Sequence, residues 1–545
     1  MKSINKILII RFSSMGDIVL TFPVVEALKE EYPDSEIFFL CKKRYKSLLL
    51  DHPRIDRVIE LDTQGVHKGI NGLTRLIKEL KPLQLDVILD LHSNLRSFII
   101  RNLVRVKTKV KYNKRWWARF FMVYFKPFKI KSKHTLDCYI QSLQKLGIKS
   151  KAKILTFHLN ENDKVWADRF LSENGWNGER ILLGVAPGAR WGTKEWDKEK
   201  FARAVEMLSG RFAMDVVLFG DKNGENTITW INQELSKKRE SGKSRGIIQA
   251  IDLPFNHVAG ILRMCDVLVT NDSGLMHLAS FLKVPVVAIF GPTHPKLGFS
   301  PLGQDSLVVT VNEKCSPCSL HGKRECHRKE RFCMDRISPE EVAEKVFAFL
   351  NREKAVFVDR DGTLIHDKNF ISKVEDVEFV PGSLEAIKIF RDMGYKVVIV
   401  SNQSGIGRGI LTKEIVDKIN EFILNQLRKE GLDVDGIYYC PHSPDDNCDC
   451  RKPNLEMVNR ASSKLNLSLK NSWAVGDKLS DVMLGKNMGG KGGLVLTGYG
   501  KKELEKIKQS SSIKPDFVVE NLLEAALIIQ KDRLSHAKNY MKQGS

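Results

Sequence analysis

Short apolar runs alternate with longer amphipathic stretches along almost the whole chain. The apolar runs fall into three series, within residues 6–91, 181–291 and 355–498. Many of these runs end in glycine, serine or aspartate before an amphipathic stretch with helical periodicity begins. This alternation is typical of α/β folds, in which helices connect parallel strands. The pattern therefore predicts an α/β protein built on parallel sheets.

The three series also predict three domains. With 545 residues, the chain is too long for one hydrophobic core. We expect the domains at 1–170, 171–350 and 354–530, and a frayed polar tail at 531–545.

Composition and charge narrow the class of protein. The chain is 42% hydrophobic and 28% charged, as is usual for a soluble globular protein. It shows no signal peptide, and no segment approaches the roughly 18 apolar residues of a membrane span. We therefore expect a cytoplasmic protein. Its formal net charge of +21 favours acidic or phosphorylated partners.

Part of this charge is concentrated in residues 101–133, which contain no acidic residue and interleave aromatic side chains with cations. Such a segment fits a surface that meets anionic headgroups, peripherally at the inner membrane, or an anionic glycolipid. The alternative is a basic helix that packs its aromatic side chains into a core. We expect no nucleic-acid partner, because no familiar nucleic-acid-binding motif is present.

One short loop carries the ligands of a metal site. Residues 440–453 read CPHSPDDNCDCRKP and offer three thiolates and one imidazole, from Cys440, His442, Cys448 and Cys450. This is the ligand set of a closed tetrahedral zinc site, which would be structural because no position is left open for water. An adventitious run of cysteine and histidine is the alternative.

A second set of cysteines leaves its role open. Cys315 and Cys318 have the CxxC spacing, whereas Cys326 and Cys333 are spread through a basic loop. A structural zinc site, a redox-sensitive thiol cluster and plain packing all fit this pattern. The remaining Cys41, Cys138 and Cys265 are expected in cores.

The third series contains the parts of a phosphatase site. Asp359 and Asp361 follow an apolar strand, where Asp359 could attack phosphorus and Asp361 could act as general acid and base. Ser401 follows the next strand with a hydroxyl for a phosphate oxygen, and Lys452 supplies a cation. Asp477 follows another strand, and its carboxylate would help to hold a hard cation such as Mg²⁺. Taken alone, the acidic pair could equally be a helix cap.

This set resembles the haloacid dehalogenase (HAD) superfamily of phosphohydrolases. More narrowly, the motifs VDRDGTL, SNQSGIGRG, DGIYYCPH, CDCRKP and GDKLSD are similar to those of the D-glycero-D-manno-heptose 1,7-bisphosphate 7-phosphatase family. The resemblance covers about residues 354–500 and implies that Asp359 is the nucleophile and Asp361 the acid/base. The implied ligands of magnesium are Asp359, Asp361 and Asp477, and those of the substrate are Ser401, Asn402, Arg451 and Lys452.

Two other functions remain open for this domain. The short gap between His442 and Cys448 is also found in histidinol-phosphate phosphatases, although SGIGRG favours a heptose substrate. The other alternative is a zinc-stapled binding module without catalysis.

The first two series end their strands in turns that suit anions. Asp17, in SSMGD, begins a helix and is either its cap or a general base. Lys194 is a candidate phosphate partner, and Ser273 and Gly274 could present backbone donors to a diphosphate at a helix start. His277, one turn later, is either a packed helix residue or a ligand.

Together these motifs resemble the ADP-heptose:lipopolysaccharide heptosyltransferases of glycosyltransferase family 9, over about residues 4–350. The resemblance implies two Rossmann-like lobes of the GT-B type, followed here by the HAD-like domain, and an inverting transfer without a metal. Asp17 would be the base and Lys194 the partner of the leaving ADP. Asp272, Ser273, Gly274 and His277 would line the nucleotide pocket, and Arg96 would hold an acidic acceptor sugar. Asp221 and Glu225 compete for the acidic position of the nucleotide lobe.

The two resemblances predict a bifunctional enzyme of lipopolysaccharide-core heptose metabolism. One site would dephosphorylate heptose 1,7-bisphosphate, and the other would transfer heptose from ADP-heptose to an inner-core lipopolysaccharide acceptor. The expected metals are Mg²⁺ at the phosphatase site and structural Zn²⁺ in the cysteine loop.

Overall fold

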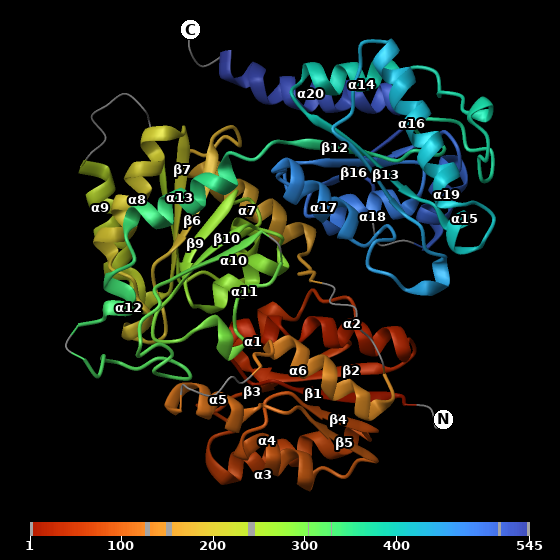
Figure 1. The fold of residues 1–545 in the computed structure, drawn as a ribbon. Helices are drawn as coiled ribbons and strands as arrows, with labels where there is room; N and C mark the ends of the chain where they lie inside the picture. Colours follow the sequence, from red (N-terminus) through yellow and green to blue (C-terminus); the bar gives the residue numbers. More distant parts are fainter. Residues whose placement is uncertain are drawn as a thin grey trace. The chain divides into compact units, whose positions relative to one another are not determined.

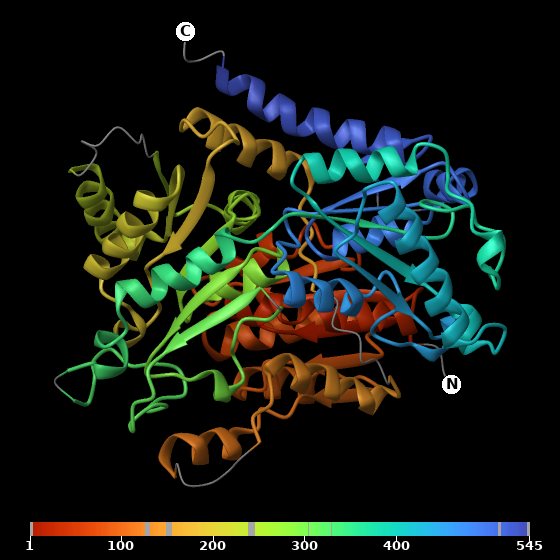
Figure 2. The ribbon, with the colours of Figure 1, turned by 45° about the horizontal axis from the view of Figure 1, so that its top comes forward.

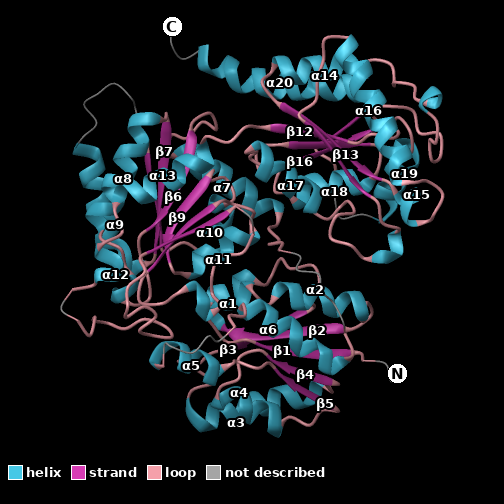
Figure 3. Cartoon of the chain, in the orientation of Figure 1, coloured by secondary structure: helices cyan, strands magenta, loops and turns pink. Residues whose placement is uncertain are grey.

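A computed structural model describes residues 4–125, 131–148, 155–237, 246–303, 305–328, 330–510 and 514–541. The chain divides into two compact units, Met1–Leu350 and Asn351–Ser545. Each unit is built from parallel sheets with helices on both faces (Figures 1 and 3).

The first sheet of unit one has the strand order β3-β2-β1-β4-β5, and all its strands are parallel. Its strands are β1 (Lys6–Ile10), β2 (Glu36–Lys42), β3 (Arg57–Leu61), β4 (Val87–Asp90) and β5 (Thr108–Lys111). The accompanying helices are α1 (Met15–Val19), α2 (Phe22–Glu31), α3 (Gly69–Leu80), α4 (Leu95–Leu103), α5 (Trp116–Tyr124) and α6 (Thr135–Ser142). The central strand β1 is almost wholly apolar because helices cover both of its faces.

The second sheet of unit one has the order β11-β10-β9-β6-β7-β8, again all parallel. Its strands are β6 (Ile181–Ala186), β7 (Met214–Gly220), β8 (Ile247–Ile251), β9 (Val267–Asn271), β10 (Val286–Phe290) and β11 (Ser306–Thr310). The accompanying helices are α7 (Glu161–Glu173), α8 (Lys198–Arg211), α9 (Glu225–Lys237), α10 (Phe255–Leu262), α11 (Gly274–Phe281), α12 (Phe332–Asp335) and α13 (Pro339–Leu350).

Unit two has one parallel sheet of order β14-β13-β12-β15-β16-β17. Its strands are β12 (Ala355–Val358), β13 (Lys396–Asn402), β14 (Gly436–Cys440), β15 (Trp473–Gly476), β16 (Lys491–Val495) and β17 (Phe517–Val519). The helices are α14 (Ser383–Asp392), α15 (Ser404–Gly407), α16 (Lys413–Lys429), α17 (Glu456–Leu465), α18 (Leu479–Asn487), α19 (Gly500–Ser510) and α20 (Leu522–Met541). Helix α20 packs along α14, as both views show (Figures 1 and 2).

All three sheets have a topological switch point, where the strand order reverses, between their first and fourth strands, counted along the chain. The reversal lies between β1 and β4, between β6 and β9, and between β12 and β15. Open α/β sheets bind ligands in the crevice outside the carboxyl ends of the strands at such a switch point. The fold therefore provides three places where polar side chains can meet a ligand.

The structure confirms the predicted fold class and adds edge strands that the apolar pattern did not single out. The added strands are β5, β11 and β17, each at the edge of its sheet. In β5 only Val110 is buried. An edge strand pairs with a neighbour on one side only, and with so few buried positions it leaves a weak apolar pattern in the sequence. Cys41, Cys138 and Cys265 are buried, as expected.

Solvent exposure distinguishes in part between the two alternatives for the basic aromatic segment, residues 101–133. Trp116, Trp117 and Tyr124 of α5 are 49%, 67% and 61% exposed, so these side chains are not packed in a core. Residues 126–130 of the segment lie outside the described part of the chain. Within the described residues, no helix combines the length and apolar character needed to cross a membrane.

The end of the chain differs from the expected frayed tail. Helix α20 continues as far as Met541, and residues 542–545 lie outside the described part of the chain.

Candidate active sites

Three carboxylates gather at the switch point of unit two. Asp359 follows β12, Asp477 follows β15, and Asp481 lies in the first turn of α18. One oxygen of each lies within 4.8 Å of the others, and all three residues are buried. Like charges this close raise the free energy of the ionised forms, so the group calls for a compensating cation.

Lys452 supplies part of this compensation. Its Nζ lies 2.5 Å from Asp359 Oδ1 and 2.6 Å from Asp481 Oδ1, and it donates to the carbonyl of Val400 at 2.9 Å. Burial acts to lower the pKa of Lys452, but the charges of Asp359 and Asp481 raise it above its ordinary value. Lys452 is therefore a fixed cation at the centre of the site.

Asp477 is the carboxylate that the protein leaves least satisfied. The backbone N–H of Tyr499 donates to its Oδ2 at 2.8 Å, whereas its fully buried Oδ1 accepts no hydrogen bond from the described residues. Burial, followed by the charge of Asp359, raises the pKa of Asp477 to about 8. A buried oxygen without a donor beside two other carboxylates fits a hard divalent cation.

Asp361 faces a different set of partners. The guanidinium of Arg360 donates to its carboxylate at 3.0–3.1 Å, Gln403 Nε2 donates at 2.7 Å, and Ser401 Oγ donates at 3.2 Å. Arg360 is 1% exposed and also donates to Asn420 Oδ1 at 2.9 Å. These bonds fix the direction of the Asp361 carboxylate beside Asp359.

The cysteine loop forms a compact four-ligand cluster. The sulfur of Cys440 lies 3.4 Å from that of Cys448 and 3.1 Å from that of Cys450, and His442 Nδ1 lies 3.2 Å from Cys450 Sγ. All four ligand atoms lie within 4.8 Å of one another, which matches the donor set of a tetrahedral zinc site. Because Cys440 ends β14 and Lys452 follows Cys450 closely, the cluster fixes the loop that carries Lys452.

In unit one, Asp17 lies in the first turn of α1, the helix that follows β1. It forms a capping box with Ser14, whose backbone N–H and hydroxyl donate to Asp17 Oδ2 at 3.2 and 2.9 Å. Arg11 Nη2 lies 2.5 Å from the same oxygen. Burial acts to raise the pKa of Asp17, but Arg11 and the bonds from Ser14 hold it below its ordinary value. The carboxylate is therefore ionised at neutral pH.

Lys194 and Asp272 meet across the switch point of the second sheet. Lys194 Nζ lies 2.7 Å from Asp272 Oδ2, and Thr293 Oγ1 donates to that oxygen at 2.5 Å. The side chain of Asn271 holds the two strand ends together, because it donates to the carbonyl of Pro187 and accepts from the N–H of Trp196. A paired lysine at a strand end can exchange its carboxylate partner for a phosphate.

The first turns of α1 and α11 bring these two sites together. A Cβ added at Gly16 would lie 2.6 Å from His277 Cδ2 and 3.2 Å from Gly274 Cα. Only glycines allow the two helices to approach this closely. His277 is 5% exposed, burial lowers its pKa to about 4, and its Nδ1 accepts or donates no hydrogen bond among the described residues.

Comparisons with known proteins separate the two units. Residues 73–328 match the family described as glycosyltransferase family 9 (heptosyltransferase), and residues 449–525 match a HAD-hydrolase-like family. A glycosyl transferase family 9 structure from Veillonella parvula aligns with a TM-score of 0.52 at 23% identity, and covers 64% of this chain and 97% of that chain. That likeness supports the fold of unit one.

Curated relatives match the second unit. The D-glycero-β-D-manno-heptose-1,7-bisphosphate 7-phosphatase of Helicobacter pylori is 40% identical over 148 residues, which are 27% of this chain and 86% of that protein. The corresponding Pasteurella multocida protein is 36% identical over 178 residues, 30% of this chain and 97% of its own length. A D-glycero-α-D-manno-heptose-1,7-bisphosphate 7-phosphatase of Campylobacter jejuni is 37% identical over 163 residues, 30% and 93% respectively.

The chain belongs to the heptose-1,7-bisphosphate 7-phosphatase family through unit two, and residues 73–328 of unit one match glycosyltransferase family 9.

In the phosphatase domain, the structure gathers most of the residues that the sequence singled out. Asp481, and not Asp361, shares the carboxylate group of Asp359 and Asp477, because the carboxylate of Asp361 is bound by Arg360 and Gln403. Asn402, expected at the substrate, instead exchanges two hydrogen bonds with the backbone of Lys452, at 3.0 and 3.3 Å. Arg451 stays partly exposed and donates to the carbonyl of His442 at 3.4 Å.

Sequence reasoning missed Arg360 and Gln403 as parts of the phosphatase site. Both sit inside motifs that were recognised, DRDGT and SNQ, but neither residue type is needed by the chemistry of Asp359. A charged residue placed between two aspartates directly after a buried strand was the available signal for Arg360.

The remaining candidates of unit one lie on other elements than Asp17 and Lys194. Arg96 lies in the first turn of α4, near the carboxyl end of β4. Asp221 and Glu225 both lie after β7 and are exposed, and Asp221 caps a short 3₁₀ turn through the N–H groups of Asn223 and Gly224.

Proposed function

We propose that the chain is a bifunctional enzyme of heptose metabolism. Unit two would remove the 7-phosphate of heptose 1,7-bisphosphate, and unit one would transfer heptose from ADP-heptose to an inner-core lipopolysaccharide acceptor. The observation that carries the first activity is the buried group of Asp359, Asp477 and Lys452 in a domain of the 7-phosphatase family. The second rests on Asp17 and Lys194 in a family 9 domain.

In the phosphatase reaction, an oxygen of Asp359 attacks the phosphorus of the 7-phosphate, and the bond between phosphorus and the sugar oxygen breaks. Asp361 gives its proton to that oxygen. Asp361 then takes a proton from water, whose oxygen attacks phosphorus and releases inorganic phosphate from Asp359. Lys452 and Ser401 hold the phosphate oxygens.

The proposal includes two metal ions in unit two, Mg²⁺ at the reacting phosphate and Zn²⁺ in the Cys440 loop. Asp359, Asp477 and Asp481, with a backbone carbonyl near Asp361, would hold Mg²⁺, which supplies charge neutralisation for the phosphate. Zn²⁺ at the cysteine loop would be structural, because the cluster already offers four protein ligands.

Phosphate release from purified protein tests the phosphatase claim. With Mg²⁺ and heptose 1,7-bisphosphate, we expect release of one phosphate and a product that keeps its 1-phosphate by ³¹P NMR. Asp359→Asn should lower the rate by more than about 10³-fold, because the nucleophile is lost. Asp376→Asn, an exposed control in the same domain, should leave the rate unchanged. Equal rates of phosphate release in Asp359→Asn and wild type would show that Asp359 is not the nucleophile.

The substrate comparison decides between the alternatives for this domain. The cited relatives of unit two are heptose-bisphosphate phosphatases, which favours the heptose substrate over histidinol phosphate. We therefore expect kcat/KM for heptose 1,7-bisphosphate to exceed that for histidinol phosphate. No release from either substrate would favour a non-catalytic binding module.

In the transferase reaction, Asp17 takes the proton of the acceptor hydroxyl. The freed oxygen attacks C1 of heptose from the side opposite to ADP, the bond from C1 to the phosphate oxygen breaks, and the anomeric configuration inverts. Lys194 exchanges Asp272 for the diphosphate of the leaving ADP. The backbone N–H groups at Ser273 and Gly274 and the imidazole of His277 line the nucleotide side.

Replacement of Asp17 tests the base. Asp17→Asn keeps the size of the capping side chain, and we expect transfer to fall by about 10²–10⁴-fold while ADP-heptose binding changes little. Asp34→Asn is the control, since Asp34 is exposed and precedes β2, at the end of the strands opposite to the proposed site. Transfer that survives in Asp17→Asn would leave Asp17 as a helix cap.

A further inference from the structure

The segment that connects β11 to α12 is long and irregular. Residues 311–331 contain no helix or strand in their described part. Structureless connections longer than about 12–15 residues are uncommon in compact domains and usually need some other constraint. Four of the chain's cysteines lie in or directly after this segment, whereas only three lone cysteines occur elsewhere outside the Cys440 loop.

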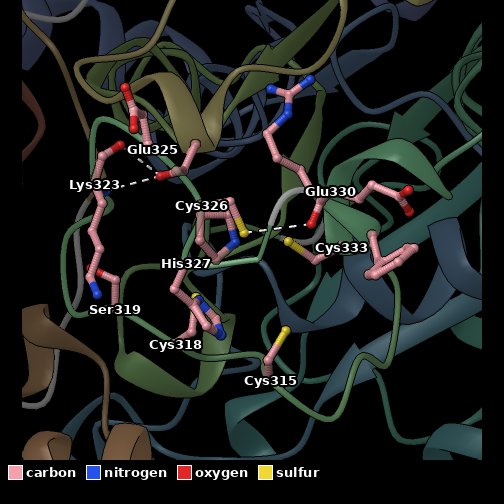
Figure 4. A pocket seen from close by; sticks show the side chains of 13 residues that line it. Cys315, Cys318, Ser319, Lys323, Glu325, Cys326, His327, Glu330 and Cys333 are labelled. Carbon is pink, nitrogen blue, oxygen red and sulfur yellow. Dashed lines mark hydrogen bonds between the residues drawn. The ribbon is translucent and has the colours of Figure 1, made fainter.

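These four cysteines line one pocket. Cys315, Cys318, Cys326 and Cys333 share it with Pro292, His327 and Phe332. Their side chains reach into the same space from different parts of the loop (Figure 4). The CxxC pair lies on one side of that space, and Cys326 and Cys333 lie on the other.

The sulfurs surround this space less tightly than those of the Cys440 loop. Among the described residues, three groups of possible metal ligands have all their ligand atoms within 4.8 Å of one another, and Cys315, Cys318, Cys326 and Cys333 do not form such a group. Cys326 Sγ instead donates to the carbonyl of Glu330 at 3.6 Å. A tetrahedral metal site, with metal–sulfur distances of about 2.3 Å, would therefore draw Cys326 away from Glu330 and tighten the loop.

The charge of the loop suits four thiolates. A divalent ion with four thiolates carries a net charge of −2, which nearby cations stabilise. The described part of the segment has five basic residues and three acidic ones, so it is net basic: Lys314, Lys323, Arg324, Arg328 and Arg331 against Glu313, Glu325 and Glu330.

The loop also holds the turn that carries Lys194. Thr193 Oγ1 donates to the carbonyl of Lys323 at 2.9 Å, and the N–H of Lys323 donates back to Thr193 Oγ1 at 2.9 Å. Arg331 donates to the carbonyl of Glu195 at 2.7 Å. The residues on either side of Lys194, Thr193 and Glu195, are therefore hydrogen-bonded to the loop that carries the cysteines.

We propose that Cys315, Cys318, Cys326 and Cys333 bind one thiophilic metal ion, Zn²⁺ or Fe²⁺, which fixes this loop against the Lys194 turn. Four sulfur ligands in a tetrahedral arrangement select these ions. Each thiol gives up its proton to bind. The ion would take no part in the chemistry and would position Lys194.

Metal counting on the full-length protein tests this site separately from the Cys440 loop. In Cys448→Ser/Cys450→Ser protein purified under reducing conditions, we expect about one equivalent of zinc or iron by elemental analysis. Adding Cys315→Ser/Cys318→Ser should remove that equivalent, whereas adding Cys138→Ala, a buried lone cysteine, should retain it. Unchanged metal content after loss of Cys315 and Cys318, or no metal before it, would overturn the proposal.

A milder variant guards against misfolding. Cys326 is partly exposed, so Cys326→Ser should fold. Metal-free Cys448→Ser/Cys450→Ser protein should gain sulfur-to-cobalt charge-transfer absorption on addition of Co²⁺, and the further change Cys326→Ser should weaken it strongly. Equal absorption with and without Cys326 would exclude it as a ligand and overturn the four-cysteine site.

The effect on transfer rests on the proposed function of unit one. Loss of the metal should raise KM for ADP-heptose about 10–100-fold through misplacement of Lys194, while phosphatase activity stays unchanged. If the protein shows no transfer at all, the metal counts still decide the site.

Discussion

At the scale of single residues, the phosphatase site is a buried excess of negative charge. Asp359, Asp477 and Asp481 share one small space, and Lys452 offsets only part of their charge. Asp477 Oδ1 is buried and accepts no hydrogen bond from the described residues, and Lys478 Nζ lies 3.9 Å from it. This arrangement costs free energy in the protein alone and is relieved when a cation binds.

That imbalance predicts how Mg²⁺ changes stability. Mg²⁺ at about 100 times its dissociation constant should stabilise unit two by about 2.7 kcal/mol, because it binds the folded site. In Asp477→Asn, the increase in Tm on addition of Mg²⁺ should be largely lost. The Tm without Mg²⁺ should change little at pH 7, because a pKa of about 8 leaves Asp477 largely protonated there and the amide is a neutral side chain of the same size. Differential scanning calorimetry with Mg²⁺ or EDTA measures both. A full Mg²⁺ response in Asp477→Asn would contradict this assignment of the ligand.

Arg360 shows what a motif leaves out at this scale. Its guanidinium directs Asp361 toward its place beside Asp359 and is itself tied to Asn420, a residue of α16 far away in the sequence. The motif DRDGT identifies the two aspartates through the chemistry proposed for them. The role of Arg360 depends on which way its side chain points, and this is decided by the packing of α16.

At the scale of elements, the candidate site residues follow the central strands of the sheets. The apolar runs predicted these strand ends well, because both faces of β1, β6 and β12 are covered. The sequence also predicted the Cys440 loop, since its ligands are near neighbours in the chain. It did not predict the pairing of Lys194 with Asp272, because two distant turns meet there through Asn271.

The contact between α1 and α11 gives an element-scale prediction. Gly16→Ala would place a methyl group 2.6 Å from His277 Cδ2, so the two helices must separate. We expect heptose transfer to fall about 10–100-fold, because small misplacements of reacting groups carry penalties of this size. Phosphatase activity should not change, since unit two has its own core.

Gly210→Ala is the matched control for this change. Gly210 lies in α8, and an added Cβ would meet nothing within 4 Å. It should leave transfer unchanged and stabilise the protein by about 0.4–1 kcal/mol. Equal transfer by Gly16→Ala and Gly210→Ala would show that the close approach of α1 and α11 is not needed for activity.

At the scale of the whole molecule, the net charge of +21 and an exposed aromatic helix point to one kind of surface. Trp116, Trp117 and Phe121 of α5 are 49%, 67% and 36% exposed, and their rings contact one another and the ring of Phe120. Large aromatic side chains beside cations favour the interface of an anionic membrane. A lipopolysaccharide precursor would present its anionic core at such a surface.

We therefore predict that the protein binds vesicles that contain anionic phospholipid and does so less well as salt rises, because the attraction is screened. Replacing Trp116, Trp117 and Phe121 by serine should lower binding about tenfold or more, since the apolar anchor is lost while every charge remains. Replacing the exposed Ile70 and Val165 by serine, at 81% and 63% exposure, should have no effect. Co-sedimentation across a salt series measures all three proteins. If charge alone held the protein to the membrane, the aromatic variant would bind as the wild type does, and α5 would have no anchoring role.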